Sequence, residues 1–235
     1  MEHTDQNHTY KRYDKELGKL KKQVANMGDH VTSQLDLLLE QLNRGGEADF
    51  ESLVENDVTI NGMEVKASKT VIRLLAKRAP VGRDLRFIIA SSRIVTDLER
   101  IGDEVVAMAK SLADSIHLGI CDTREVSSDL SNLIARSMNL LDRALLAAQN
   151  EDEKTAQDIM SNDLLRGGGF HEEANKLIVC VREHYDSMEQ SFNVALQVNA
   201  LTRIADHICN ICEHVVFLVT GEDIRHQNEG ELSES

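Results

Sequence analysis

Proline and aromatic residues are scarce in this chain. Its 235 residues contain one proline, no tryptophan, three tyrosines and five phenylalanines, against a usual proline share of about 5%. Sandwiches and barrels need β-branched and aromatic strands separated by many turns, so the composition argues against them. Leucine, alanine and glutamate favour helices instead. The sequence predicts an all-α fold with far more helix than the roughly one third of an average soluble protein.

Positive charge and long apolar runs are also lacking. The formal net charge is −14, which repels nucleic acids and anionic lipid headgroups, and no basic patch dominates the sequence. No apolar run reaches the roughly 18–20 residues of a membrane span, and residues 1–22 lack the apolar region of a signal peptide. We expect a cytoplasmic protein with no nucleic-acid partner and no direct membrane insertion. Reduced thiols are then expected at Cys121, Cys180, Cys209 and Cys212.

Motifs of the common enzyme classes are missing as well. The sequence has no G-x-x-x-x-G-K-[ST] phosphate loop and no H-E-x-x-H zinc motif. It has no G-x-S-x-G nucleophile turn and no Glu-x-x-His pair of the di-iron bundles. His207, Cys209, Cys212 and His214 suggest zinc, but helical geometry places the cysteines and the histidines on opposite sides. All four therefore cannot reach one tetrahedral ion.

Helical spacing of apolar residues is present almost throughout the chain. The third segment contains Glu99-Arg100-Ile101-Gly102-Asp103, and Thr202-Arg203-Ile204-Ala205-Asp206 matches it 103 positions later. This repeat predicts two three-helix bundles, over 1–118 and 119–221, followed by a polar tail over 222–235 that we expect to be disordered. The predicted helical segments are 8–43, 47–78, 82–117, 123–150, 152–186 and 188–220.

Acidic residues recur on the third and sixth segments. Glu99 and Asp103 are one turn apart, and Asp206, Asn210 and Glu213 follow i, i+4, i+7 spacing; both sets are predicted to face away from the core. Two carboxylates one turn apart repel, and a hard or borderline cation such as Mg²⁺, Mn²⁺ or Fe would remove the repulsion. The alternative interpretation is an ordinary solvated acidic face.

The second segment places acids within an apolar stripe. Asp57 and Glu64 share a face with apolar residues, so each needs a hydrogen bond, a cation or a basic partner; Lys66, Lys69 or Arg73 is the alternative to a metal. Pro80 makes a tight turn, so the second and third segments should be antiparallel neighbours. Their levels then match, and the sequence predicts one metal site from Asp57, Glu64, Glu99 and Asp103.

Several segments together carry a family resemblance over about residues 15–225. They are Met27-Gly28-Asp29-His30-Val31, Asn56-Asp57 with Met63-Glu64, Ala76-Lys77-Arg78-Ala79-Pro80 with Asp84-Leu85-Arg86, Asp97-Leu98-Glu99-Arg100-Ile101-Gly102-Asp103, and Arg203-Ile204-Ala205-Asp206 with Asn210-Ile211-Cys212-Glu213. The chain resembles the PhoU family. The resemblance implies two three-helix bundles related by a pseudo-twofold, and a homodimeric negative regulator of the phosphate regulon and of phosphate uptake. It also implies two partners, the ATPase subunit of the phosphate ABC transporter and the phosphate-sensing histidine kinase.

The same resemblance implies metal clusters of Fe, Zn, Mn or Mg ions. The first would use Asp57, Glu64, Glu99 and Asp103. The second departs from the family pattern, because Thr202 replaces a carboxylate and Gly167-Gly168-Gly169 should kink or break the fifth helix. Its candidate ligands are Asp163, Asp206, Asn210 and Glu213.

The turn between the second and third segments is basic. We expect it to bind partners, and the alternative is a solvated turn in which Arg86 pairs with an acid of the chain. The overall hypothesis is a non-enzymatic adaptor, and the alternative is a metal-dependent phosphohydrolase that uses the acidic helix faces. The candidate partner-binding residues are Lys77, Arg78, Arg83 and Arg86.

Overall fold

The computed structural model describes the chain except for residues 1, 45–49, 118–123, 165–168, 185–187 and 225–235. The described residues contain no strand, so the predicted all-α class is confirmed. The elements are α1 (Glu2–Arg44), α2 (Glu51–Arg78), α3 (Gly82–His117), α4 (Arg124–Asn150), α5 (Glu153–Asp158), the π-helical turn η2 (Ile159–Leu164), α6 (Gly169–His184) and α7 (Met188–Thr220).

The predicted segments agree with these helices except in the fifth. The third segment coincides with α3 and the sixth with α7. The fifth, predicted over 152–186, is divided into α5, η2 and α6. Asp152 begins this stretch as an N-cap, because its carboxylate accepts a hydrogen bond from the Thr155 backbone. The predicted break at the glycine run falls mostly outside the described residues, and α6 begins at Gly169.

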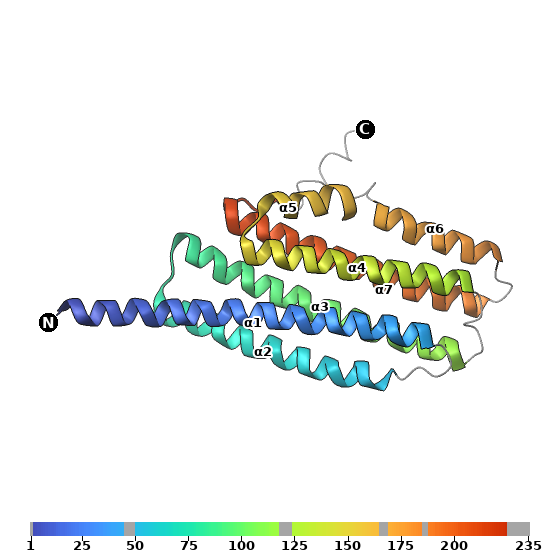
Figure 1. Cartoon of the computed structure of the whole chain (residues 1–235), viewed down its shortest axis with the longest axis horizontal. Helices are drawn as coiled ribbons and strands as arrows, with labels where there is room; N and C mark the ends of the chain where they lie inside the picture. Colours follow the sequence, from blue (N-terminus) through green and yellow to red (C-terminus); the bar gives the residue numbers. More distant parts are fainter. Residues whose placement is uncertain (1, 45–49, 118–123, 165–168, 185–187, 225–235) are drawn as a thin grey trace.

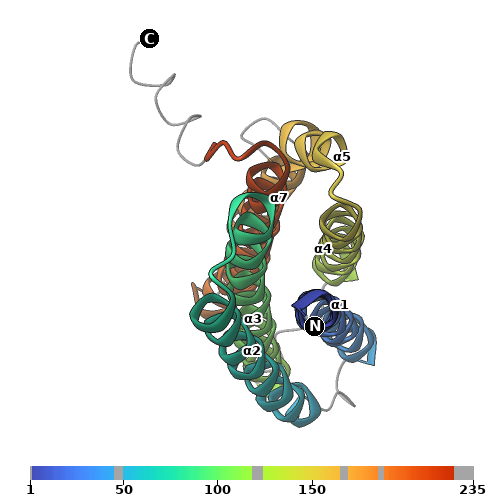
Figure 2. The same ribbon diagram turned by 90° about the vertical axis from the view of Figure 1, so that its left-hand side faces the viewer.

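The long helices form a curved layer with two helices on its concave side. Figure 2, which looks roughly along the helices, shows α2, α3 and α7 following one another around the curve, with α1 and α4 inside it. The most extensive packing joins α3 of the first half to α7 of the second. These two helices are antiparallel (Figure 1), since Arg86 near the start of α3 binds the Leu218 carbonyl near the end of α7.

One hydrophobic core runs through both halves of the chain. It extends from Met27 and Leu35 on α1 to Val215 on α7, and Phe170 on α6 is among its largest fully buried side chains. A smaller cluster of Leu20, Val71, Leu74 and Ile88 closes the end where α1, α2 and α3 meet. Apolar residues at helical spacing therefore bury a face of every long helix.

Close approach of α1 to α4 depends on a glycine. A Cβ added at Gly28 would lie 2.6 Å from Cδ1 of Leu145 on α4, so any larger side chain must push Leu145 away. Gly18, ten residues earlier on the same helix, has open space around it. The two positions separate the effect of helix propensity from that of packing between α1 and α4.

We predict that Gly28→Val destabilises the protein by about 1–3 kcal/mol, because overpacking forces neighbouring side chains out of their rotamers. Gly18→Val is the matched control and should change the stability by only a few tenths of a kcal/mol, because the site has open space and Val is a slightly better helix former than Gly. Urea unfolding followed by circular dichroism measures both. A Gly28→Val variant as stable as the native chain would contradict the close approach.

Candidate functional site

Four carboxylates come together between α2 and α3. Asp57 and Glu64 lie on α2, Glu99 and Asp103 lie on α3, and all four are half-buried. The expected outward orientation of Glu99 is wrong: its side chain is 24% exposed and lies within electrostatic range of both α2 acids. Antiparallel packing after the Pro80 turn brings the two pairs to the same level, as the spacing predicts.

Like charge and burial perturb two of these carboxyls. Burial raises the pKa of Asp57, and the Asp103 carboxylate raises it further. Burial also raises the pKa of Glu99, followed by the charges of Asp103, Glu64 and Asp57. Arg100 lies 3.4 Å from Glu99 and 3.5 Å from Asp103 and offsets part of this repulsion. The repulsion that remains is the electrostatic condition that a bound cation relieves.

Side chains of the same helix provide hydrogen bonds to the α2 acids. Asn61 Nδ2 donates to Asp57 Oδ2 at 2.9 Å, and Ser68 Oγ donates to Glu64 Oε1 at 2.7 Å. The basic alternative is not realised among the described residues, where none of Lys66, Lys69 and Arg73 pairs with either acid. Asp57 and Glu64 thus each retain one carboxylate oxygen for another partner.

Three oxygens beside this group are buried without a hydrogen-bond donor in the described structure. They are Gln34 Oε1, Asp57 Oδ1 and Asn61 Oδ1. Gly102 on α3 lies against two of them: a Cβ there would be 3.2 Å from Asp57 Oδ1 and 3.3 Å from Gln34 Oε1. An unpaired buried oxygen is costly, and an oxygen-binding cation would satisfy it. Gly102 leaves the space between them open.

These donors suit a hard cation in chemical kind, since carboxylate and amide oxygens are ligands for Mg²⁺ and Mn²⁺. The arrangement does not yet enclose an ion. In the ranges that the structure describes, no three His, Cys, Asp or Glu side chains converge on one point. Glu64, Glu99 and Asp103 would have to change their side-chain rotamers to complete a coordination shell.

The second predicted cluster does not form one acidic face. Asp206 is exposed and lies 3.5 Å from His171 Nε2 of α6. Asn210 instead turns toward α3, so the predicted outward stripe of α7 is wrong at that position. Glu213 is half-buried, and the side chain of Asp163 lies outside the described residues.

Asp97 on α3 is the centre of a buried polar cluster that the sequence reasoning missed. His207 Nδ1 lies 2.9 Å from its Oδ1 and His214 Nε2 lies 3.0 Å from its Oδ2, while Asn210 Nδ2 donates to Oδ1 at 3.1 Å. Burial alone would raise the pKa of Asp97, but the hydrogen bonds from the three α7 side chains outweigh it and lower that pKa to about 2. The ionised carboxylate holds the two halves of the chain together.

The signal for this cluster was present in the spacing. His207, Asn210 and His214 follow i, i+3, i+7 and therefore share one face of α7. The stripe proposed from Asp206, Asn210 and Glu213 shares Asn210 with that face but takes Asp206 and Glu213 in place of the adjacent His207 and His214. His207 and His214 face α3.

Cysteines do not contribute a metal site to this face in the described part of the chain. Cys209 and Cys212 are free, and Cys212 is buried in the core. Burial raises the pKa of Cys209 to about 12 and raises that of Cys212 as well, so neither is a ready thiolate ligand. The side chains of Cys121 and Cys180 lie outside the described residues.

Most of the basic turn between α2 and α3 is engaged within the chain. Arg78 Nε donates to Glu16 at 2.9 Å, and Arg83 pairs with Glu151 after α4. The alternative interpretation expected Arg86 to pair with an acid. Among the described residues it has no ion pair and instead donates to the Leu218 backbone carbonyl at 3.2 Å. Arg83 is still 71% exposed. Lys77 is exposed and has no ion pair among the described residues.

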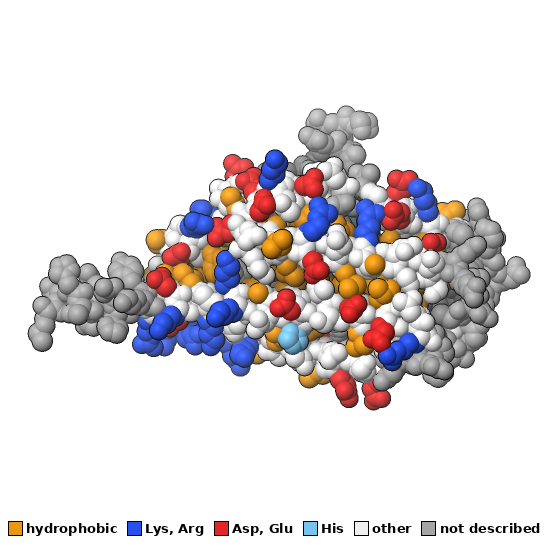
Figure 3. All heavy atoms as spheres, in the orientation of Figure 1, with side chains coloured by type: hydrophobic (Ala, Val, Ile, Leu, Met, Phe, Trp, Pro, Cys, Tyr) orange, Lys and Arg blue, Asp and Glu red, His pale blue; other side chains and the backbone are white. Residues whose placement is uncertain are grey.

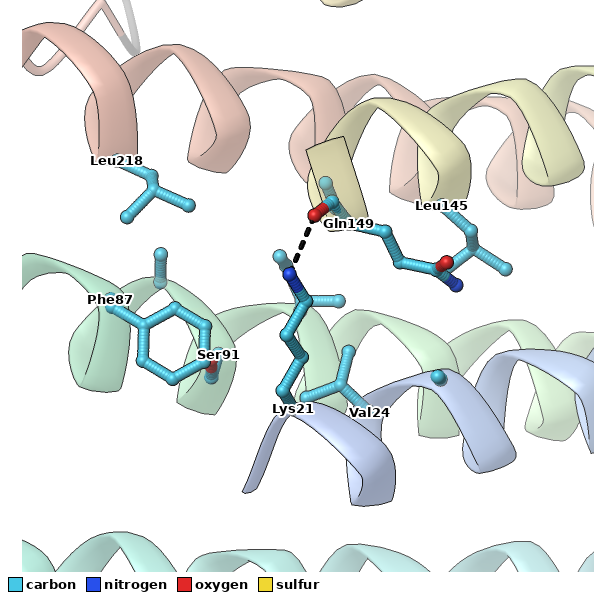
Figure 4. Close-up of a pocket in the computed structure, with 11 residues that line it drawn as sticks. Lys21, Val24, Phe87, Ser91, Leu145, Gln149 and Leu218 are labelled. Carbon is cyan, nitrogen blue, oxygen red and sulfur yellow. Dashed lines mark hydrogen bonds between the residues drawn. The ribbon is translucent and has the colours of Figure 1, made fainter. Parts of the chain in front are cut away.

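A small cavity lies where α1, α3, α4 and α7 meet. Figure 4 shows Phe87, Val24, Leu145 and Leu218 around it, and Lys21 Nζ donates to the Gln149 carbonyl at 2.8 Å. Its volume of about 30 Å³ has room for one or two water molecules. No carboxylate lines it, so it does not extend the acidic site.

Comparison with known proteins places the whole chain in one family. The PhoU domain model matches residues 24–112 and 130–215, and the chain belongs to the PhoU family. It is 32% identical over 217 residues to the phosphate-specific transport system accessory protein PhoU homolog of Xylella fastidiosa (strain Temecula1 / ATCC 700964), covering 92% of this chain and 89% of the relative. Identity to the Escherichia coli (strain K12) accessory protein PhoU is 25% over 225 residues, covering 96% and 92%.

Solved structures agree with the fold. The phosphate transport system regulatory protein PhoU from Streptococcus pneumoniae superposes with a TM-score of 0.78 at 26% identity, covering 90% of this chain and 98% of that one. PhoU from Pseudomonas aeruginosa gives a TM-score of 0.76 at 24% identity, covering 89% and 100%. In the described ranges, no helix is long and apolar enough to cross a bilayer.

We predict a specific acid sensitivity from Asp97. Its folded pKa of about 2 lies below the ordinary 3.8, so its stabilisation is complete above that ordinary value and is lost as pH falls toward 2. The full contribution is about 2 kcal/mol. The stability gap between the native chain and Asp97→Asn should narrow by about 1 kcal/mol from pH 5 to pH 3. Urea unfolding at each pH measures the gap.

Asp114→Asn is the matched control, because Asp114 is an exposed carboxyl on the same helix. The free energy of unfolding of Asp114→Asn should be close to that of the native chain at both pH values. An Asp97→Asn gap that stays constant from pH 5 to pH 3 would rule out a strongly depressed carboxyl pKa.

Proposed function

We propose that this protein is a negative regulator of the phosphate regulon and of phosphate uptake, acting as a non-enzymatic adaptor in the cytoplasm. The observation that carries the proposal is the match of both halves of the chain to the PhoU domain. Relatives covering most of the chain are named accessory proteins of the phosphate-specific transport system. The proposed partners are the transporter ATPase subunit and the phosphate-sensing histidine kinase.

An adaptor works by a docking equilibrium and needs no chemistry of its own. A coupling free energy of about 1–3 kcal/mol changes occupancy roughly 5–150-fold. The alternative phosphohydrolase would use a metal at the α2–α3 carboxylates, so an activity assay with a phosphate ester and Mn²⁺ separates the two.

A divalent cation or iron is the proposed ligand of the α2–α3 carboxylates. Asp57, Glu64, Glu99 and Asp103 would hold it, and the orphan oxygens of Gln34 and Asn61 support that assignment. Bound there, the ion would neutralise the repulsion between helices and stiffen the first half of the molecule. The second cluster lacks comparable support among the described residues.

We further propose that the chain functions as a homodimer and that the α2–α3 turn contacts the partners. Lys77 and Arg83 are the residues of this turn best placed to do so. Lys77 is exposed without an ion pair among the described residues, and the pairing of Arg83 with Glu151 is a surface contact that a partner's carboxylate can replace. Arg78 and Arg86 are more deeply committed to contacts within the chain. Arg83→Glu should therefore weaken capture of the transporter ATPase subunit.

Cation binding predicts a difference in stability that appears only with the metal. In chelator, Glu99→Gln/Asp103→Asn should be within a few tenths of a kcal/mol of the native chain, because the substitutions remove like charges and also the exposed contacts of both acids with Arg100. With Mn²⁺ the native chain should become the more stable of the two, and the variant's affinity for Mn²⁺ should fall at least about tenfold. Thermal melts and isothermal titration calorimetry measure these effects.

Asp206→Ala serves as the control for the cation experiment, since Asp206 is an exposed acid of the second predicted cluster and lies outside the α2–α3 site. It should leave Mn²⁺ affinity unchanged. Equal Mn²⁺ binding by the native chain and the Glu99/Asp103 variant would show that the assignment to α2 and α3 is wrong.

Deletion of the gene should leave phosphate-regulated genes expressed in phosphate-rich medium, because the proposed brake on signalling is gone. A reporter fused to a phosphate-starvation promoter measures this directly. Restoration by the native chain on a plasmid is the control. Normal repression in a deletion strain that carries no second copy of the gene would contradict the proposed regulatory function.

A further inference from the structure

Basic side chains gather where α1 and α2 lie side by side. Figure 3 shows Lys and Arg side chains concentrated along the lower edge of the molecule, below the first part of α1 and toward the end of α2. No linear run of the sequence indicates this group, because two segments far apart in the chain contribute to it. We call it the basic surface; its residues are Lys15, Lys19 and Lys22 on α1 and Lys66, Lys69 and Arg73 on α2.

Two contacts between α1 and α2 bring the basic residues of both helices together. Gln23 Nε2 of α1 donates to the Lys66 carbonyl of α2 at 3.4 Å, and Arg78 Nε of α2 donates to Glu16 of α1 at 2.9 Å. Two basic residues of each helix lie between these contacts along the chain. The three lysines of α1 follow i, i+4, i+7 spacing and the three residues of α2 follow i, i+3, i+7, so each set shares one face of its helix.

The charges of the basic surface are not neutralised within the described chain. Its five lysines are exposed, and none forms an ion pair among the described residues. Arg73 Nε is buried there without a hydrogen-bond acceptor. Glu16 lies within electrostatic range of Arg73 but is already bonded to Arg78. Like charges on neighbouring turns repel, so an anion from outside the chain would stabilise this face.

Acidic residues border the basic surface without entering it. Asp29 lies seven residues after Lys22 on α1, and Glu55 lies eleven before Lys66 on α2. At 1.5 Å per residue these separations are about 10 Å and about 16 Å, longer than the Debye length of about 8 Å at physiological salt. Asp14 is exposed but lies about 100° around α1 from its neighbour in the basic surface. The basic surface therefore acts as a separate patch of positive charge.

Exposed aliphatic side chains lie along the outer edge of the basic surface. Val65 and Ile72 are 48% and 65% exposed, and they lie one turn before and one turn after Lys69. Basic and aliphatic side chains together on an exposed helix face are typical of helices that lie on a membrane surface. Nucleic-acid surfaces instead add aromatic or amide side chains that stack on bases or bond to their edges, and the basic surface contains neither kind.

We propose that the basic surface of α1 and α2 binds the anionic headgroups of a phospholipid membrane, so that the protein adsorbs to the membrane without inserting into it. Clusters of four to eight basic residues on a helical surface are typical of such binding. Because the whole chain carries a net charge of −14, the membrane would repel its other faces, and the protein would adsorb in one orientation. The inference does not depend on the partners proposed for the adaptor.

Vesicle sedimentation tests the binding. The purified full chain should pellet with vesicles of equal parts phosphatidylglycerol and phosphatidylcholine, and it should stay in the supernatant with phosphatidylcholine alone. Binding should weaken with salt, because the Debye length falls from about 10 Å at 0.1 M to about 3 Å at 1 M. Lys19→Glu/Lys69→Glu should weaken it at least about twenty-five-fold, since each basic residue near an anionic surface contributes about fivefold.

Lys154→Glu/Lys176→Glu is the matched control. Lys154 and Lys176 are exposed lysines of α5 and α6, so the net charge changes by the same amount at a distance from the basic surface. Its vesicle binding should stay within about twofold of the native chain, because screening limits the effect of remote charges. Circular dichroism verifies that both double variants are folded. An equal loss of binding in the two would show that net charge decides and would overturn the proposal.

Single tryptophans test which face touches the lipid, since the native chain has none. The emission of Ile72→Trp should shift to shorter wavelength when anionic vesicles are added, because the indole moves from water into the membrane interface. Leu146→Trp is the control, at a site on α4 that is 58% exposed in the native chain, and its emission should not shift. An Ile72→Trp emission that shifts no more than that of Leu146→Trp would place the contact elsewhere and overturn the proposal.

A native chain that stays in the supernatant with anionic vesicles at low salt would refute membrane binding outright. Tighter binding of a DNA duplex than of the vesicles would assign the basic surface to nucleic acid and would also count against the proposal. These measurements use the purified chain and lipid alone. Their failure is therefore distinguishable from failure of the regulatory function, which the phosphate-starvation reporter measures separately.

Discussion

The buried carboxylate of Asp97 is the constraint on which the arrangement of the two halves depends. It lies on α3 and takes all its described hydrogen bonds from α7, so it fixes the register of the most extensive helix pair in the molecule. A buried charge without these donors would be strongly destabilising. The pairing therefore specifies how α3 and α7 align as well as stabilising them, while the apolar core around it is less selective about register.

From this alignment follow the positions of the other helices. α2 returns along α3 after the Pro80 turn and delivers its acids opposite Glu99 and Asp103, and α1 closes the concave side, where Gly28 allows α4 to approach. The inner face of α2 thus lines the candidate cation site while its outer face stays apolar and exposed.

Sequence periodicity predicted the helices well, because each long helix buries a clear apolar stripe. The level of Asp57 relative to Glu99 was also predictable. Residues at similar numbers of positions before and after a tight turn lie at similar heights along the two antiparallel helices. The rotation of each helix about its own axis was not predictable. On α7 the proposed stripe placed Asn210 on the outward face, although it contacts α3, and the orientation of Glu99 depended on where α2 packs. Spacing within one helix cannot say which neighbour it faces. The π-helical turn η2 likewise left no separate signal in the fifth segment.

Antiparallel packing of α3 and α7 has an electrostatic consequence at the end where α3 begins. A helix carries about half a positive charge at its N-terminus and half a negative charge at its C-terminus, and here the start of α3 lies beside the end of α7. Arg86 adds a full positive charge there and donates to the Leu218 carbonyl at 3.2 Å. The two helix dipoles thus neutralise each other, and the last carbonyls of α7 gain a cationic donor from the opposite half of the repeat.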